Sequence, residues 1–462
     1  MILPLAFESR IKEQLKEFYP EFIDSLKKDL PISIRINPKK MSNSPAGLTS
    51  VLWEPRGYYL PTRPSFTLDP LLHAGAYYVQ EASSMFTGYL FQEVITTEKP
   101  LKVLDLCGAP GGKSTQLASL LSSDSLLVAN EVIRSRAGIL NENLVKWGAP
   151  NVVITQNDPR DFKRIKNSFD VIVVDAPCSG EGLFRRDSGA VQEWSEANTL
   201  LCAQRQQRII ADVWDALTPG GVLIYSTCTF NPGENEKNLN WLSEQFDAES
   251  LNINYPESWG IETREYKGMV GYQLFPHKVQ GEGFFIGAVK KSGEFTETKN
   301  KTKKQLNTAS KTIQYEAAQW IKEADAYTII EQNENLTAIP TLYESFIQQL
   351  YGNLNVVHAG IRLAQIKGKK LIPQPELALS WQINQERFPY QELSEYEALQ
   401  YLKKENQHFK EQQAGYHLVG YKNLPLGWLN NIGNRSNNTY PGSWRIRMDL
   451  PTRESFSSQS FL

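Results

Sequence analysis

Two cysteines, Cys178 and Cys228, each come a few residues after a short apolar run. The run Val171-Ile172-Val173-Val174 precedes the first, and Val222-Leu223-Ile224-Tyr225 precedes the second. A cysteine thiolate is a strong nucleophile that can form a covalent intermediate with a substrate. Most buried cysteines are instead inert small hydrophobes, which is our interpretation of Cys202 on its predicted helix. Cysteines at strand ends that face a ligand are candidates for covalent catalysis.

The two apolar runs belong to an alternation of strands and helices between residues 101 and 289. Runs rich in β-branched residues are typical of strands that are buried on both faces of a parallel sheet. Ligands of such sheets bind outside the carboxyl ends of the strands. The sequence therefore predicts an α/β fold with a doubly wound, mostly parallel sheet, and it predicts that both thiols face one crevice.

A glycine-rich turn lies between the first predicted strand of this alternation, residues 102–106, and the helix after it. Glycines let the backbone turn tightly and approach a ligand, and a helix N-terminus offers free N–H groups. The spacing from Gly108 to Gly112 is one residue too short for a phosphate-cradling G-x-x-x-x-G-K-[ST] loop. The candidate cofactor-binding loop comprises Cys107, Gly108, Ala109, Pro110, Gly111, Gly112 and Lys113.

Three acidic residues, Glu131, Asp158 and Asp175, stand at the ends of the next three predicted strands. Glu131 follows the glycine turn at about the 20 residues at which an acidic side chain meets ribose hydroxyls. Carboxylates in this arrangement suit a ligand with an adenosine and a cation better than one with phosphates. We therefore infer S-adenosylmethionine as the cofactor. The alternative is that each acid caps the helix that follows it.

A thiol beside such a cofactor has a specific use. A thiolate can add to carbon 6 of a pyrimidine and make carbon 5 nucleophilic toward an electrophilic methyl group. A carboxylate at the N3 edge of the base would favour the protonated adduct, and Asp175 is close to Cys178 in the sequence. The adduct must then lose its carbon-5 proton and expel the enzyme, a step that a second thiol can assist.

Three motifs resemble the Nop/Sun family of RNA cytosine-5 methyltransferases, and within it the bacterial RsmF-type ribosomal RNA enzymes. They are Asp105 to Lys113, Asp175 to Gly182 and Ser226 to Glu236. The segments Tyr78 to Glu81, Pro276-His277 and Gly281 to Phe285 match the same family. The resemblance is most specific from about 70 to 290. Over 312 to 462 it depends on layout, because RsmF-type enzymes end in extra domains, the last of them PUA-like.

The resemblance implies a role for each matching position. The backbone from Cys107 to Lys113, with Glu131, Asp158 and Asp175, would bind S-adenosylmethionine. Cys228 would be the nucleophile, and Cys178 would promote product release. DNA cytosine-5 methyltransferases use their Pro-Cys cysteine as nucleophile, so this division depends on the family and not on the residues alone. For Lys113 a solvated lysine and a group near the cofactor carboxylate remain open.

The resemblance also implies an order of domains. Residues 1–70 form an α/β RNA-binding lead-in, and 71–290 form the methyltransferase domain, a Rossmann-like sheet. Residues 291–311 form a lysine-rich linker, 312–400 an accessory α/β domain, and 401–462 a small PUA-like β-barrel that binds RNA. Arg185 and Arg186 would hold a flanking phosphate or make capping salt bridges, and the last unit would bind RNA or serve only in packing.

Local patterns give four further expectations. The sequence predicts one helix over residues 77–94 and a turn between strands over residues 53–59. Arg35 and Asn37 are expected on a strand surface, and the lysines of the linker are expected in solvent.

Composition narrows the class of protein. Of 462 residues 41% are apolar and 22% charged, with a formal net charge of −2, so binding to nucleic acid must depend on local basic faces. No apolar run approaches the ~18 residues of a membrane span. Four cysteines without CxxC pairing argue against a metal site and favour the cytoplasm.

The expected function is an S-adenosylmethionine-dependent RNA cytosine-5 methyltransferase. Its expected substrate is 16S rRNA or the small ribosomal subunit, with a flipped cytosine attacked by Cys228, and a monomer is expected. A transfer RNA substrate remains open. A non-catalytic RNA-binding factor is disfavoured because both cysteines and all three acids are present, and a small-molecule methyltransferase because it would not need the C-terminal residues.

Overall fold

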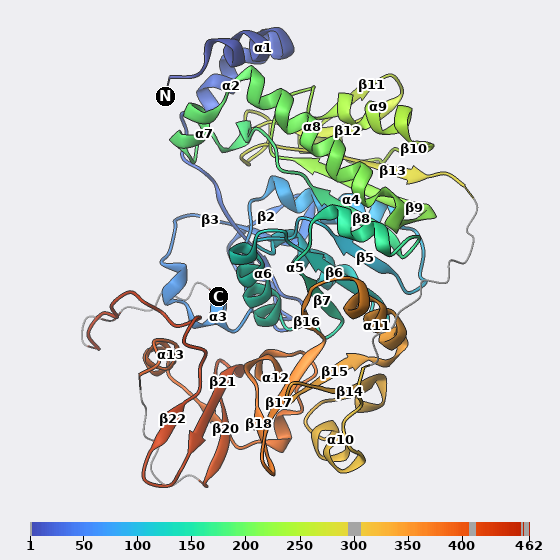
Figure 1. Cartoon of the computed structure of the whole chain (residues 1–462). Coiled ribbons are helices and arrows are strands. Elements are labelled where there is room, and N and C mark those ends of the chain that lie inside the picture. The colour runs from blue at the N-terminus through green and yellow to red at the C-terminus, as the bar shows by residue number, and fades with distance from the viewer. Residues whose placement is uncertain (1, 294–305, 406–412, 454–455, 457–461) are drawn as a thin grey trace.

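A large mixed sheet organises the molecule (Figure 1). The computed structural model describes residues 2–293, 306–405, 413–453, 456 and 462. The strand order is β11-β12-β13-β9-β8-β5-β6-β7-β16, and β10 also pairs with β13. The parallel centre consists of β7 (Val152–Thr155), β6 (Leu126–Asn130), β5 (Lys102–Asp105), β8 (Phe169–Asp175) and β9 (Leu217–Thr227). The predicted α/β class is therefore confirmed.

Antiparallel strands extend this parallel centre at both edges, so the sheet is less uniformly parallel than predicted. On the β9 side lie β13 (Phe284–Lys291), β12 (Met269–Leu274), β11 (Glu262–Tyr266) and β10 (Ala248–Leu251). On the β7 side lies β16 (Val356–Ala359). The sequence missed β10 and β11 because their residues alternate only between partly buried and exposed positions.

Both faces of the parallel strands are covered, which explains their continuous apolar runs. Val171 to Val174 have no exposed surface, and each such side chain contributes about 1.5–3 kcal/mol by leaving water. One face packs under α4 (Phe86–Val94), α5 (Gly112–Leu120) and α6 (Arg134–Trp147). The other packs under α8 (Glu196–Val213), α9 (Glu236–Gln245) and α11 (Glu344–Asn353).

The N-terminal part contains two helices and a small antiparallel sheet. The helices are α1 (Leu5–Leu15) and α2 (Tyr19–Ser25). The sheet has the order β2-β3-β1-β4 and consists of β1 (Ile32–Ile36), β2 (Thr49–Val51), β3 (Glu54–Leu60) and β4 (Tyr77–Val79). The expected turn at 53–59 is wrong, since most of it is strand β3.

The single helix predicted for 77–94 is also wrong. Tyr77 to Val79 form strand β4 against β1, as their aromatic and β-branched side chains favour. Helical structure starts only with the turn η3 (Ser83–Met85) and continues as α4. The carboxylate of Glu81 accepts hydrogen bonds from the backbone N–H groups of Ser83 and Ser84, and so caps this turn.

Arg35 and Asn37 do not lie on the surface, which corrects the expectation for both. Arg35 is 1% exposed and Asn37 is fully buried. The guanidinium lies 4.6 Å from the ring centre of Trp147 and donates hydrogen bonds to Gln80 Oε1, Thr115 Oγ1 and Gly112 O. These contacts attach β1 to the start of α5.

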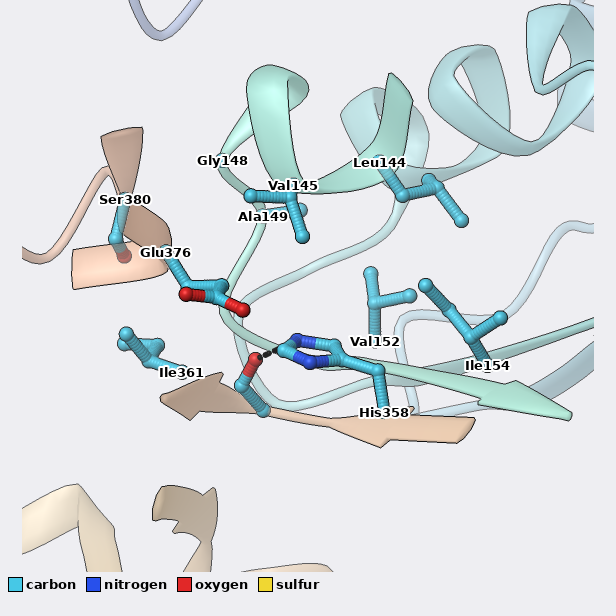
Figure 2. A pocket seen from close by; sticks show the side chains of 11 residues that line it. Leu144, Val145, Gly148, Ala149, Val152, Ile154, His358, Ile361, Glu376 and Ser380 are labelled. Carbon is cyan, nitrogen blue, oxygen red and sulfur yellow. Dashed lines mark hydrogen bonds between the residues drawn. The ribbon is translucent and has the colours of Figure 1, made fainter. Parts of the chain in front are cut away.

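The segment after the large sheet is joined to it. A second four-stranded sheet consists of β14 (Tyr327–Gln332), β15 (Asn335–Pro340), β17 (Ile361–Lys367) and β18 (Lys370–Pro373). Between β15 and β17 the chain crosses to the large sheet and adds β16 to the edge of β7. Figure 2 shows the small cavity at this junction, where the carboxylate of Glu376 points toward the imidazole of His358.

The last sheet consists of β19 (Tyr390–Glu392), β20 (Gly415–Tyr421), β21 (Leu424–Asn431) and β22 (Ser436–Asn438). Trp428 of β21 is 1% exposed, contacts Phe388 and donates its indole N–H to Gln374 O. Trp428 therefore serves in packing. Leu399, Tyr401 and Leu429 share a core with Ile34 and Tyr58 of the N-terminal sheet.

The lysine-rich stretch is only partly described. Lys290 and Lys291 belong to β13, and Lys291 Nζ donates to the carbonyl oxygens of Trp214 and Leu217. Lys291 is therefore no solvated linker residue. Lys311 begins α10 (Lys311–Ala318). The lysines at 299, 301, 303 and 304 lie outside the described residues. Within the described parts of the chain, no helix has the length and apolarity that a membrane span requires.

Candidate active site

The structure brings Cys178 and Cys228 together. Asp175, at the end of β8, is paired in register with Ser226 near the end of β9, so the loops after the two strands start side by side. The sulfur atoms of Cys178 and Cys228 lie 3.1 Å apart, although the residues are 50 positions apart in the sequence. Both thiols are partly exposed. The parallel pairing of β8 and β9 thus creates a two-thiol centre.

Two loops carry the thiols. The loop after β8 contains Pro177-Cys178 and is called the Pro-Cys loop, and the loop that starts with Thr227-Cys228 at the end of β9 is called the Thr-Cys loop. Main-chain hydrogen bonds connect them. The N–H of Ala176 donates to Ser226 O, and the N–H of Gly182 donates to Cys228 O, each at 2.8 Å. Gly182 has to be glycine, because a Cβ there would lie 2.9 Å from Cys228 O. The nucleophile candidate is therefore held by its own carbonyl group.

Glu181 holds the same region from the other side. Its buried carboxylate accepts hydrogen bonds from the backbone N–H of Phe230 and the indole N–H of Trp194. It also forms an ion pair with Arg10 on α1, whose guanidinium donates a further hydrogen bond to Phe230 O. Helix α1 is therefore fixed to the back of the Thr-Cys loop.

Asp175 is held at both carboxylate oxygens. Ser226 Oγ donates to Oδ1 at 2.8 Å, and Lys113 Nζ lies 2.9 Å from Oδ2. The Lys113 side chain is only 13% exposed, and its ammonium lies 4.8 Å from the ring centre of Phe284. Lys113 is therefore not a solvated lysine, which removes one of the two alternatives left open by the sequence.

The two thiols have different electrostatic surroundings. Burial lowers the pKa of Lys113, but the charges of Asp175, Asp105 and Cys228 outweigh it and raise the pKa overall, so the lysine remains a cation near Cys228. The hydrogen bond to Cys228, burial and the charge of Glu234 raise the pKa of Cys178 well above its ordinary value. Cys178 therefore stays a thiol and can donate its S–H to the sulfur of Cys228.

The glycine-rich turn lines a cavity next to Asp175. The cavity has a volume of about 230 Å³. Its wall includes Cys107, Gly108, Ala109, Pro110, Gly112, Lys113 and Asp175, together with Tyr78, Val79, Gln80, Glu81, Ser84 and Arg186. Gly111 has φ +121° as the N-cap of α5, a conformation that favours glycine. The loop carbonyls of Ala109 and Pro110 accept hydrogen bonds from Arg136 and Asn143 on α6.

Asp105 supports this turn from inside the protein. It is fully buried, and its Oδ2 accepts a hydrogen bond from Ser114 Oγ at 2.5 Å, whereas its buried Oδ1 has no partner within the described residues. Burial raises the pKa of Asp105 to about 6. Burial and the charge of Asp105 raise the pKa of the Cys107 thiol as well, so that Cys107 is not an activated nucleophile.

Glu131 and Asp158 do not line this cavity. Glu131 follows β6, accepts a hydrogen bond from the N–H of Ile133 and lies 3.4 Å from Arg136. Asp158 lies three residues beyond the end of β7 and caps the 3-10 helix Pro159–Arg164 through the N–H of Arg160. Asp158 therefore makes the capping contact that the sequence left as the alternative, whereas α6 after Glu131 receives no side-chain cap.

Tyr78, Gln80 and Glu81 line the cavity, although sequence reasoning gave them no role. The sequence contained a signal for them, because Tyr78-Val79-Gln80-Glu81 matched the family, but the chemistry of these side chains did not assign them to the cavity.

Arg185 donates to the carbonyl oxygens of Asp29 and Gly281, and Arg186 forms an ion pair with Glu282. No set of three or more His, Cys, Asp or Glu side chains in the described segments could hold a metal ion.

Comparisons with known proteins agree with this arrangement. Residues 94–290 match the family 16S rRNA methyltransferase RsmB/F, residues 3–82 the N-terminal domain of 16S rRNA methyltransferase RsmF, and residues 390–446 the methyltransferase RsmF PUA domain. The chain is 32% identical over 450 residues to Ribosomal RNA small subunit methyltransferase F of Shewanella loihica, covering 91% of this chain and 90% of that protein. The protein of the same name from Klebsiella pneumoniae is 30% identical over 475 residues, covering 95% of each chain.

Among solved structures, a methyltransferase homologue from Pyrococcus horikoshii is 28% identical with a TM-score of 0.50, covering 60% of this chain and 92% of that one. NSun6 from the same organism, solved with SFG, has a TM-score of 0.51 at 20% identity, covers 63% of this chain and 99% of that one, and supports the fold alone. The fold and the site define a Rossmann-like methyltransferase. The chain belongs to the 16S rRNA methyltransferase RsmB/F family.

Proposed function

We propose that the protein is an S-adenosylmethionine-dependent methyltransferase that acts on carbon 5 of a cytosine in 16S rRNA through a covalent adduct. The observation that carries the proposal is the two-thiol centre: Cys178 and Cys228 lie 3.1 Å apart at the carboxyl ends of adjacent parallel strands, next to Asp175. A methyltransferase that attacks a more nucleophilic atom would not need paired thiols there.

Cys228 is the nucleophile in this proposal. Its thiolate adds to carbon 6 of the cytosine, and carbon 5 becomes nucleophilic. The ammonium of Lys113 is near Cys228, whereas Cys178 is near the buried acid Glu234. This difference in neighbouring charges supports the same division of roles that the family resemblance implies. Asp175 accepts a hydrogen bond from the N3–H of the protonated adduct.

Cys178 acts in release. After methylation carbon 5 still carries its proton. A water molecule accepts that proton, the electron pair re-forms the double bond between carbons 5 and 6, and Cys228 leaves carbon 6 as a thiolate. Cys178, next to the Cys228 sulfur, can donate its S–H to the departing thiolate. A base in a stacked helix cannot reach such a centre, so the target cytosine must be flipped out or lie in a loop.

The residues of the cavity fit the cofactor. The turn from Cys107 to Lys113 presents backbone and a helix N-terminus, and the buried Oδ1 of Asp105 has no partner among the described residues. Bound S-adenosylmethionine would supply the electrophilic methyl group. Asp175 lines the cavity, whereas Glu131 and Asp158 lie outside its wall. They stay in the proposed set because of their positions after β6 and β7, where Glu131 would hold the ribose.

The RNA substrate is proposed from the relatives. The curated relatives from S. loihica and K. pneumoniae are named small subunit ribosomal RNA methyltransferases and align along nearly the whole chain. Arg435, Arg445 and Arg447 are exposed in the C-terminal part and are available to RNA phosphates. We propose a monomer that works in the cytoplasm. Bisulfite sequencing of total RNA from a deletion strain tests the substrate, and a lost site in a transfer RNA would contradict it.

Two variants test the proposed roles. Cys228→Ala should abolish methyl transfer and adduct formation. Cys178→Ala should accumulate a covalent RNA–protein adduct, seen as a shifted band on a denaturing gel with labelled 16S rRNA. Full activity of Cys228→Ala, with Cys178→Ala alone inactive, would reverse the assignment. Cys202→Ala is the control, because Cys202 lies on α8 and is not part of the two-thiol centre.

A further inference from the structure

Glu234, which follows the Thr-Cys loop, carries a buried carboxylate that is directed at the other thiol loop. The side chain is fully buried. Its Oε2 accepts hydrogen bonds from the backbone N–H of Ser179 at 2.9 Å and from Gln206 Nε2 at 3.0 Å, and its Oε1 accepts one from Ser179 Oγ at 2.5 Å. Ser179 is the residue directly after Cys178. Glu234 therefore holds the Pro-Cys loop next to its thiol.

The same network connects both thiol loops. Ser179 Oγ and Thr229 Oγ1 lie 3.0 Å apart, and Thr229 directly follows Cys228. The single hydroxyl hydrogen of Ser179 goes to the carboxylate, so Thr229 is the donor in this contact. Gln206 Nε2 also donates to Pro177 O, the residue before Cys178. The residues on both sides of Cys178 are therefore fixed by one network.

The network requires a carboxylate and not merely a polar side chain. Three N–H or O–H groups converge on Glu234, and each of them donates. In the described part of the chain no lysine, arginine or histidine lies within ion-pair distance of Glu234. Burial raises the pKa of Glu234 to about 7, although the hydrogen bonds from Ser179 lower it. A buried acid without a cation costs folding free energy, so stability alone does not explain it.

We propose that Glu234 is a positioning residue for the release step: through Ser179 it holds the Cys178 thiol beside the adduct at Cys228. This inference rests on the proposed function, since it needs Cys178 to act in release. It differs from a general structural role in one consequence. When the Pro-Cys loop is displaced, attack by Cys228 continues but elimination slows, and the adduct accumulates.

The test is Glu234→Gln. Glutamine has nearly the same size, but its NH₂ group would face one of the converging donors, so the Pro-Cys loop must shift. With purified full-length protein and 16S rRNA from a strain that lacks the gene, we expect turnover to fall about tenfold or more. We also expect the ratio of adduct to methylated product to rise toward that of Cys178→Ala. Glu196→Gln, an exposed acid at the start of the helix that carries Gln206, should match the wild type.

Each outcome decides the proposal. A folded Glu234→Gln with wild-type turnover and no adduct would overturn it, and so would a folded variant that forms neither product nor adduct, because the residue would then act in attack. If Cys178→Ala itself accumulates no adduct, the proposed function fails independently of Glu234. Should Glu234→Gln not fold, Ser179→Ala removes only the hydroxyl contact and must still raise the ratio of adduct to product.

Discussion

The ammonium of Lys113 lies 2.9 Å from Oδ2 of Asp175, and this ion pair joins the glycine-rich turn to the strand that leads to Cys178. Lys113 belongs to the first turn of α5, and Asp175 ends β8. Both partners line the cavity at the glycine-rich turn. The pair therefore couples the proposed cofactor site to the proposed site of the base.

Replacement of Lys113 by methionine should disable the site without unfolding the protein. Lys113→Met leaves the Asp175 carboxylate with Ser226 as its one side-chain partner among the described residues, and it removes the cation near Cys228. We expect methyl transfer to 16S rRNA to fall about 100-fold, as for loss of one stabilising group in an active site. The control is Lys163→Met, which breaks the more exposed ion pair between Lys163 and Asp212 and should change activity less than about twofold. Equal effects of both variants would show that the Lys113 pair has no special role.

The central strands and helices could be predicted from sequence because their signals are local. The alternation of strands and helices predicted between 101 and 289 agrees with elements such as α6 and β7. The position of the two thiols followed from the same patterns, since parallel strands end at one edge of the sheet. The central strands share a continuous apolar pattern that needs no distant partner.

Contacts between distant segments could not be predicted. The pairing of β16 with β7 joins residues about 200 positions apart, and no local pattern marks β16 as an edge strand of the large sheet. The sequence predicts a surface position for Arg35, although the side chain is buried. The prediction is wrong because the partners of Arg35, Gln80 and Thr115, come from other elements. Polar residues in a strand pattern are normally solvent-facing, and only the tertiary structure shows that Arg35 is satisfied internally.

Removal of Arg10 should impair catalysis from outside the cavity. Arg10→Ala leaves the buried carboxylate of Glu181 without its cation and releases one hydrogen bond to Phe230 O. We expect the free energy of unfolding to decrease by about 2 kcal/mol, which is in the usual range for hydrogen bonds to a charged group. We also expect the methyl-transfer activity of Arg10→Ala to be well below that of Lys12→Ala. Lys12 lies on the same helix but is exposed. Thermal unfolding and methyl transfer measured on both variants check this, and an active, stable Arg10→Ala would contradict it.

Mild oxidation should link the two thiols. Their sulfur atoms lie 3.1 Å apart, and a disulfide requires about 2.05 Å, so a small movement is enough. Treatment with diamide should abolish methyl transfer, and dithiothreitol should restore it. Thiol labelling followed by peptide mapping should show that Cys178 and Cys228 lose their free thiols together. The same loss is expected in the Cys202→Ser variant, which serves as the control. Persisting activity and labelling after diamide would mean that the two loops hold the sulfur atoms apart.

His358 should make the junction between β16 and the large sheet sensitive to acid. The residue is 7% exposed and lies beside Glu376 (Figure 2). Its Nε2 lies 2.7 Å from Gly360 O, which can only accept, so Nε2 carries a hydrogen. Burial and the charge of Arg362 lower the pKa of His358 to about 4. Burial raises the pKa of the neighbouring Glu376, which gives the opposite dependence on pH.

The sign of the effect of His358 follows from its lowered pKa. Between the ordinary value of 6.5 and about 4 the unfolded chain binds a proton at His358 and the folded chain does not, so stability is lost as the pH falls through this range. At pH 5 the loss is about 2 kcal/mol. His358→Gln keeps a donor for Gly360 O but cannot be protonated, and Glu376 is unchanged in it. The melting temperature should therefore fall less in His358→Gln than in the wild type between pH 7.5 and pH 5, and equal falls would exclude His358 as the cause.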